Sequence, residues 1–204
     1  MNEREIAEAL ARFPTGNLCN ANSDVRAMRS SLQSLYADIK IAGPAKTVRI
    51  VPGQNAAIHH AVHTAQQGQV LVVDADGDRG HGPFGDILAS ACINRGIVGL
   101  IIDGTVRDSA EIRQLKFPVF CLGTNPTATA KSAPGEIDIE IGCGDVRVRP
   151  GDIVVGDDDG VVVVPKEIAS SVIEQAGEVD RKEQVIKERL AQGETTYQIL
   201  NIGP

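Results

Sequence analysis

A pair of opposite charges follows an apolar run in the stretch "GLIIDGTVRDSAE", residues 99–111. The run at 100–102 is typical of a buried strand, and Arg107 stands beside Asp108 just after the turn that follows it. An arginine there can grip a carboxylate with two hydrogen bonds or neutralise an oxyanion. An aspartate can hold Mg²⁺, which often takes one or two protein carboxylates and keeps waters as its other ligands. The pair is therefore a candidate for binding a substrate and a metal.

A structural role explains the same residues. Asp108 is a suitable N-cap for a helix over "SAEIRQL", with Glu111 completing a start that resembles a capping box and Arg107 exposed to solvent. Capping and metal binding do not exclude each other, so the local sequence leaves both roles open.

The strands and the helix around this pair predict where it lies. Residues 69–74 and 97–102 have the composition of buried strands, and residues 86–95 between them have that of a helix. Two strands joined in this way run parallel, so both end at the same edge of the sheet, where the helix also begins. The start of the helix and the turn that carries Arg107 and Asp108 should therefore meet in one crevice.

The first turn of this helix, "GDIL", supplies free backbone N–H groups at that crevice. A helix N-terminus binds carboxylates and phosphates, and a glycine lets a ligand approach the backbone closely. The candidate binding residues of this turn are Gly85, Asp86, Ile87 and Leu88.

Helices are expected at both ends of the chain. Ile6 and Leu10 favour a helix over 3–12, and "SDVRAMRSSLQSLY" favours a second helix with Ser23 as its N-cap. At the other end, residues 166–192 predict one long charged helix that keeps apolar side chains on one face.

An α/β core is expected between these helices. A strand at 46–51 and a helix at 55–66 come before the β-α-β unit, and "PVFCLG" follows it as a further strand. The runs "IDIEI", "DVRVR", "DIVVG" and "GVVVVP" then predict antiparallel hairpins, with "GDDDG" as one of their turns. We expect a single α/β domain with a mixed sheet, made of N-terminal helices (1–40), an α/β core (41–165) and a C-terminal helical arm (166–204).

Two other polar groups resemble metal sites. "DADGDRGHG", residues 74–82, begins like a calcium loop, but Arg79 and Gly85 stand where such a loop needs glycine and glutamate. We expect a flexible loop at the active edge instead. His59 and His63 share one helix face, but no glutamate follows the first histidine and no third ligand is apparent. We therefore expect a partly buried or solvated histidine pair.

Composition excludes several classes of protein. The 20 basic and 27 acidic residues give a net charge of -7, and only 3% of the residues are aromatic, so nucleic acid is not an expected partner. The charged N-terminus and the lack of about 18 consecutive apolar residues make a secretory leader or a membrane span unexpected. Four cysteines without a C-x-x-C pair favour the reducing cytoplasm: Cys19, Cys92, Cys121 and Cys143.

Two long segments resemble a known superfamily. These are "FGDILASACINRGIVGLIIDGTVRDSAEIRQLKFPVF" and "VRPGDIVVGDDDGVVVVP". They resemble the 4-hydroxy-4-methyl-2-oxoglutarate/4-carboxy-4-hydroxy-2-oxoadipate aldolases and the regulators of ribonuclease E activity, over roughly residues 40–195. The resemblance implies a swivelling β/β/α-type domain that assembles as trimers or dimers of trimers, with active sites between subunits.

The resemblance also implies a role for each candidate residue. Asp108 would be the direct ligand of Mg²⁺ or Mn²⁺, and Arg107 and the "GDIL" amides would bind the substrate. Asp86 would hold the waters of the metal. A glutamate from a neighbour's C-terminal arm would complete the site, with Glu183 as the first candidate and Glu178 as the second.

The implied activity is that of a carbon–carbon lyase. It would be a divalent-metal-dependent cleavage of a 4-hydroxy-2-oxo diacid to pyruvate and a 2-oxo acid, with decarboxylation of oxaloacetate as a side activity because that also leaves pyruvate enolate. A Schiff-base aldolase is disfavoured, since its lysine needs a desolvated site or a cationic neighbour and every lysine here has a polar sequence context. The alternative from another class is a non-catalytic regulator that binds a ribonuclease or helicase through its acidic surface.

Overall fold

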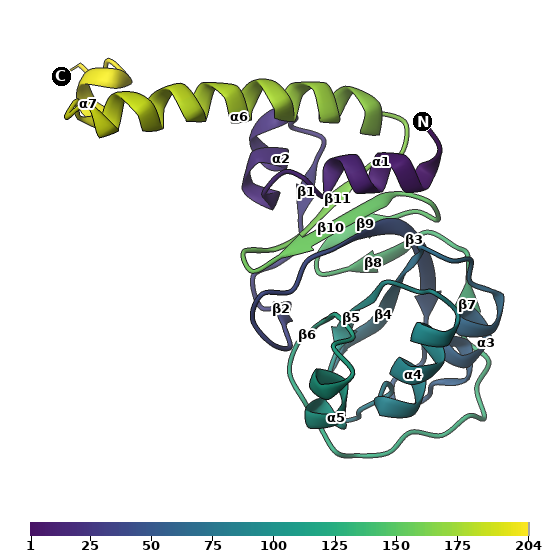
Figure 1. Ribbon diagram of the computed structural model, residues 1–204. Coiled ribbons are helices and arrows are strands. Elements are labelled where there is room, and N and C mark those ends of the chain that lie inside the picture. Colours follow the sequence, from purple (N-terminus) through teal and green to yellow (C-terminus); the bar gives the residue numbers. More distant parts are fainter. Residues whose placement is uncertain (204) are drawn as a thin grey trace.

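The computed structural model describes residues 1–203, and Figure 1 shows one large sheet with helices packed against it. The strand order in this sheet is β1-β11-β10-β3-β4-β5-β6-β2, and β7 pairs with β3. The strands in chain order are β1 (Arg26–Ala27), β2 (Gln33–Ser34), β3 (Ile41–Arg49), β4 (Val70–Asp78), β5 (Gly99–Gly104), β6 (Val119–Cys121), β7 (Glu136–Ile137), β8 (Ile141–Cys143), β9 (Val146–Val148), β10 (Ile153–Asp157) and β11 (Gly160–Val164). The helices are α1 (Glu3–Leu10), α2 (Thr15–Ala21), α3 (Ala56–Thr64), α4 (Asp86–Asn94), α5 (Ser109–Gln114), α6 (Ala169–Ala191) and α7 (Thr196–Ile199).

Four parallel strands, β3 to β6, form the centre of the sheet. All six residues of β5 are buried, which explains its continuous apolar run. Helices α3, α4 and α5 cover one face through Ile58, Leu88 and Ile112. The crossover helices start at the edge where β3, β4 and β5 end, as the β-α-β pattern predicts.

A separate hairpin, β8–β9, covers the other face of these strands. Its residues Ile141, Cys143 and Val148 pack against Val72 and Ile101. The layers are thus hairpin, sheet and helices, and the expected α/β class with a mixed sheet and a C-terminal helical arm is confirmed.

Antiparallel strands extend the sheet beyond β3. Strands β10 and β11 form a hairpin whose turn joins Asp157 to Gly160, so the predicted turn at "GDDDG" is confirmed. Helices α1, α2 and α6 pack on this part of the sheet through Leu10, Leu18 and Val172. Helix α6 then runs on past the body of the molecule and carries α7 at its far end (Figure 1).

The prediction of a helix starting at Ser23 is wrong. The second helix is α2, which begins after Pro14, and residues 22–40 contain only β1, β2 and turns, so the predicted helical unit at 1–40 ends at Asn22. The helix-like spacing of Val25, Met28 and Leu32 has another cause. Val25 packs in the cluster beneath α6, whereas Met28 and Leu32 pack beside β8–β9, and Met28 N–H bonds to a carbonyl of β11.

Two further expectations need correction. The run "IDIEI" is divided between β7 and β8, because Asp138 takes a left-handed conformation between them. Residues 74–82 are also not a loop throughout. Strand β4 continues to Asp78, and Arg49 Nε binds Asp74 at 3.1 Å. No helix among residues 1–203 is long and apolar enough to cross a membrane.

Candidate functional site

The loops after β4 and β5 meet at the edge where the parallel strands end, and a pocket opens between them. This is the convergence that the β-α-β pattern predicts. The lining residues are Asn55, His59, Gly82, Pro83, Gly85, Asp86, Ile87, Leu88, Arg107, Asp108 and Lys131. All the predicted residues of the "GDIL" turn and the Arg107–Asp108 pair are therefore in one place.

Arg107 and Asp108 form an ion pair in the lining of this pocket. Arg107 Nε lies 3.3 Å from Asp108 Oδ2, and both side chains are about one-third exposed. Arg107 N–H bonds to Phe84 O at 2.9 Å, which ties the pair to the loop before α4. Both charges thus remain partly accessible to a ligand.

The backbone of Asp108 has a left-handed conformation, with φ at 53°. Asp108 occupies the N-cap position of α5, but in the described chain its carboxylate makes no capping hydrogen bond to that helix. The Asp108 side chain therefore does not cap α5, although the sequence left that role open. The carboxylate turns instead toward α4, where its Oδ2 fills the space that a Cβ on Gly85 would need. Unusual backbone geometry of this kind, which costs about 1–3 kcal/mol, is often kept at functional sites.

The first turn of α4 lines the pocket with Gly85, Asp86, Ile87 and Leu88. Ile87 N–H donates to Asp86 Oδ1 at 2.8 Å, so this amide is already occupied by a side chain. The Ile87 side chain is 73% exposed at the pocket mouth, whereas Leu88 is buried beneath it. Fewer backbone N–H groups are thus free to bind an anion than the sequence predicts. Asp86 also adds a carboxylate to the lining of the pocket.

Sequence reasoning missed one wall of the pocket, formed by Asn55, His59 and Lys131. Asn55 is 7% exposed, and its Nδ2 donates to Pro83 O at 3.0 Å. Its Oδ1 is buried without a hydrogen-bond partner among the described residues. A buried acceptor left unpaired in a pocket is available to a ligand that can donate a hydrogen bond.

His59 and Lys131 add polar groups to the same wall. His59 lies one turn beyond Asn55 on α3, and burial, followed by the nearby Lys131 charge, lowers its pKa from the usual value. His59 and His63 are both exposed, in agreement with the expected solvated pair. Asn55 and His59 could have been found from the sequence, because they are four residues apart at the start of a helix that begins at this edge of the sheet. No such signal was available for Lys131.

Glu183 and Glu178 lie far from this pocket within one chain. Both are in α6, which packs on the β10–β11 part of the sheet, away from α4 and α5 on the parallel strands (Figure 1). Glu183 accepts a hydrogen bond from Asn17 Nδ2 at 3.2 Å, and Glu178 is exposed. Neither glutamate can join Asp108 unless it comes from another copy of the chain.

The donor set of the pocket suits a hard cation. Residues 1–203 contain no group of three or more histidine, cysteine, aspartate or glutamate side chains that could hold a metal alone. The pocket does contain the carboxylates of Asp108 and Asp86. Oxygen donors of this number, completed by water, fit Mg²⁺ or Mn²⁺ better than zinc.

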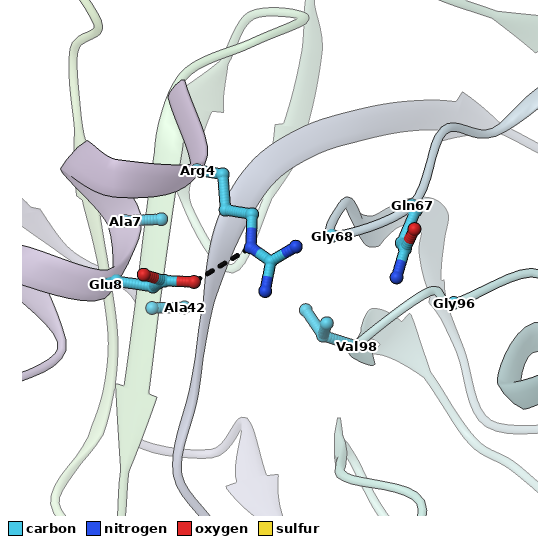
Figure 2. A pocket seen from close by; sticks show the side chains of 8 residues that line it. All are labelled: Arg4, Ala7, Glu8, Ala42, Gln67, Gly68, Gly96 and Val98. Atoms are coloured by element: carbon cyan, nitrogen blue, oxygen red, sulfur yellow. Dashed lines mark hydrogen bonds and ion pairs between the residues drawn. The ribbon is translucent and has the colours of Figure 1, made fainter. Parts of the chain in front are cut away.

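A second hollow lies at the opposite edge of the parallel strands. Figure 2 shows Arg4 and Glu8 of α1 facing Gln67 and the backbone of Gly68 and Gly96. Its charged side chains are the Arg4–Glu8 pair, 2.8 Å apart and more than 60% exposed. An exposed pair that neutralises itself offers little for catalysis, so the candidate site is the pocket around Asp108.

Comparison with known proteins agrees with this placement. Residues 15–163 match the model of the RraA-like family, described as Aldolase/RraA. The chain belongs to the RraA-like family. The match includes every lining residue of the pocket around Asp108 and ends before α6.

Relatives of this RraA-like protein include one named as an aldolase and others named as inhibitors of RNA processing. A protein of Halalkalibacterium halodurans named "Putative 4-hydroxy-4-methyl-2-oxoglutarate aldolase" is 37% identical over 86% of this chain and 85% of its own length. The structure of Streptomyces coelicolor RraAS2, titled an unusual member of the RNase ES inhibitor RraA family, is 30% identical over 90% of this chain and 96% of its own, with a TM-score of 0.79. The RNA-processing inhibitor RraA of Thermus thermophilis is 29% identical over 74% of this chain and 92% of its own, with a TM-score of 0.70.

Proposed function

We propose that this RraA-like protein is a divalent-metal-dependent carbon–carbon lyase that cleaves 4-hydroxy-4-methyl-2-oxoglutarate or 4-carboxy-4-hydroxy-2-oxoadipate to pyruvate and a 2-oxo acid. The observation that carries the proposal is Asp108 itself. Its carboxylate is free of the helix it precedes, lies beside Arg107 and faces the first turn of α4. The name of the Halalkalibacterium halodurans relative supports the same activity.

Mg²⁺ or Mn²⁺ held by Asp108 would supply Lewis-acid chemistry at the 2-oxo group. Arg107 would bind the carboxylate next to that group and stabilise the negative charge that develops as the C3–C4 bond breaks. The first-turn amides of α4 other than Ile87 N–H would hold the same carboxylate. Asp86, at the pocket entrance, would take the proton of the C4 hydroxyl, and the electron pair of the broken bond would leave on C3 as the enolate of pyruvate. Return of the proton to C3 completes pyruvate.

The wall formed by Asn55, His59 and Lys131 would determine which substrates bind. Asn55 Oδ1 would accept a hydrogen bond from the substrate hydroxyl, since this buried oxygen otherwise has no donor within the described part of the chain. Lys131 would attract the second carboxylate of a diacid. Oxaloacetate would also be a substrate, because its decarboxylation leaves the same enolate.

A neighbouring subunit would complete this site. The far end of α6 and the α7 segment expose apolar side chains that the body of the chain does not cover, namely Val185, Leu190, Tyr197, Leu200 and Ile202. We expect these side chains to pack on a second copy in a trimer or a dimer of trimers, with Glu183 of the neighbour reaching Asp108. The four unpaired cysteines fit a place of action in the cytoplasm.

The test is release of pyruvate from each diacid and from oxaloacetate, with Mg²⁺ and with EDTA. We expect turnover with the metal and none with the chelator. Absence of pyruvate from all three substrates with both Mg²⁺ and Mn²⁺ would contradict the proposal. It would favour the second candidate, a regulator that binds a ribonuclease, which the names of the two RraA relatives and the net charge of -7 support.

A further inference from the structure

Asp78 and His81 lie beside the candidate pocket without lining it. We propose that they form a positioning pair that holds two loops of the site in register, an inference that rests on the proposed function. The loops are residues 53–55, which lead into α3, and residues 79–85, which lead into α4. The first loop carries Asn55 to the pocket, and the second contacts Arg107.

The pair has the geometry of a charge-assisted hydrogen bond. His81 Nδ1 lies 2.8 Å from Asp78 Oδ2, and Gly80 N–H donates to Asp78 Oδ1 at 2.7 Å. The Asp78 side chain is 14% exposed, so water competes little for it. Because the carboxylate is an acceptor, a neutral His81 carries its proton on Nδ1 and leaves Nε2 free.

The imidazole reaches the first loop through its other side. A Cβ on Gly53 would lie 3.2 Å from His81 Nε2, and the φ of 77° at Gly53 already favours glycine there. The Gly53 N–H also helps to lower the pKa of Asp78, which places the loop against both members of the pair. Two residues later, Asn55 begins the wall of the pocket.

The second loop transmits the same constraint to Arg107. Gly82 follows His81 directly, and a Cβ on Gly82 would lie 2.8 Å from Arg107 Cβ. The carbonyls of the next two residues accept hydrogen bonds from Asn55 Nδ2 and Arg107 N, at 3.0 and 2.9 Å. A shift of this loop therefore displaces Arg107 and Asn55 together.

Other hydrogen bonds keep the loop folded when the pair is removed. Thr105 Oγ1 donates to His81 O at 2.5 Å, and Gly82 N–H donates to Thr127 O at 2.9 Å. Asn125 Nδ2 donates to Arg79 O at 2.8 Å. None of these bonds joins the loop to Gly53. Loss of the imidazole should thus let residues 53–55 and 79–85 move relative to each other without unfolding the protein, with the hydrogen bond from Asn55 Nδ2 to Pro83 O left between them.

The test compares His81→Leu with His81→Asn, whose amide nitrogen can replace Nδ1 as the donor to Asp78. His63→Leu, an exposed histidine of α3, is the matched control. We expect kcat/KM for oxaloacetate to fall by on the order of tenfold or more in His81→Leu, because small displacements of positioning groups reduce catalysis strongly. We expect His81→Asn to recover part of it, because it keeps the donor to Asp78 but not the ring against Gly53, and His63→Leu to match the wild type.

A merely structural role would lower Tm but leave kcat and KM of the folded enzyme unchanged, and that result would overturn the proposal. So would a His81→Asn variant as impaired as His81→Leu. A wild-type protein that releases no pyruvate would instead contradict the proposed function. In that case amide hydrogen exchange tests the pair, since His81→Leu should speed exchange at residues 53–55 and 79–85 relative to His81→Asn, and equal rates would overturn it.

Discussion

The Oδ2 atom of Asp108 occupies the space that a side chain on Gly85 would fill. The carboxylate that we propose as the metal ligand thus lies against the backbone of Gly85, and no side chain stands between it and the first turn of α4. A ligand held by Asp108 is consequently within reach of the α4 amides and of Arg107, whose Nε lies 3.3 Å from the same oxygen.

Gly85→Ala tests this relationship. The new methyl group would displace the Asp108 carboxylate and crowd Arg107 Nε, which would lie 3.2 Å from it. We expect kcat/KM with Mg²⁺ to fall by about 100-fold or more, as for other small misplacements of a positioned group. Gly142→Ala is the control, because a Cβ there meets nothing within 4 Å. Normal turnover of Gly85→Ala would contradict the assigned role of Asp108.

Asp108→Asn should remove metal-dependent turnover and leave the fold intact. Asparagine tolerates the left-handed conformation of this position as well as aspartate does, so the backbone has no reason to change. A neutral amide is, however, a much poorer ligand for a hard cation than a carboxylate. Binding of Mn²⁺, measured by calorimetry, should be lost together with activity, while Tm stays near the wild-type value. Retained Mn²⁺ binding would place the ion elsewhere.

The edge at which the site lies was predictable because few topologies satisfy a β-α-β sequence. Parallel strands must end on one edge, so "GDIL" and the Arg107–Asp108 turn had to approach each other although they are far apart in the sequence. The prediction of a helix at Ser23 was wrong because more than one local structure satisfies its apolar spacing. Apolar residues three and four positions apart are typical of a helix, but an extended segment can have the same spacing when its side chains pack into two different clusters. Val25 and Met28 do so.

Lys131 was beyond the reach of sequence reasoning. It lies in the long loop between β6 and β7, and no periodicity sets the path of that loop. Backbone hydrogen bonds set it instead, because Ala130 N–H bonds to Gly53 O and Asn55 N–H bonds to Ala130 O. The polar sequence context of Lys46 likewise did not show that it is buried, because it is 5% exposed in β3 and pairs with Asp138 at 2.7 Å.

The presence of Lys131 in the pocket makes a Schiff-base test necessary. We expect borohydride in the presence of pyruvate to leave activity unchanged and EDTA to abolish it. Lys131→Met should keep the metal dependence but raise KM for the diacids several-fold, because the ammonium group attracts the second carboxylate. Lys40→Met, an exposed lysine elsewhere, is the control. Inactivation by borohydride that resists EDTA and disappears in Lys131→Met would show a Schiff base on Lys131.

Acid should weaken the protein through Asp78. Burial alone would raise the pKa of this carboxyl, but hydrogen bonds from Gly80 N–H and His81 outweigh it and hold the pKa below its ordinary value of 3.8. A carboxyl whose pKa is lower in the folded state stabilises the fold above pH 3.8, and this stability is lost as the pH falls through the lowered pKa.

The corresponding measurement is Tm of the wild type and of Asp78→Asn across pH. A hydrogen bond to a charged group contributes about 1.5–3 kcal/mol, and about 1 kcal/mol shifts Tm by about 2–4 °C in a chain of this size. We expect the variant to melt several degrees lower at pH 7 and the difference to narrow below pH 3.8. A difference that is constant with pH would mean that the charge of Asp78 does not contribute.

The last prediction concerns Glu183, which the proposed function assigns to a neighbour's site. In its own chain Glu183 bonds to Asn17, so its loss could act locally or across subunits. Mixed oligomers separate the two cases. Asp108→Ala and Glu183→Ala should each be inactive as pure assemblies, because every site in either assembly lacks one of the two carboxylates.

Co-assembly of the two variants should restore part of the activity. In a ring with head-to-tail contacts, about one quarter of the interfaces would pair an intact Asp108 from one chain with an intact Glu183 from the next. Activity should therefore approach about one quarter of the wild-type value. Asn17→Ala is the control for the local contact, and it should remain active when Glu183 serves the neighbour. Verified mixed oligomers without recovery, together with an inactive Asn17→Ala, would instead assign Glu183 to the packing of α6 on α2 in its own chain.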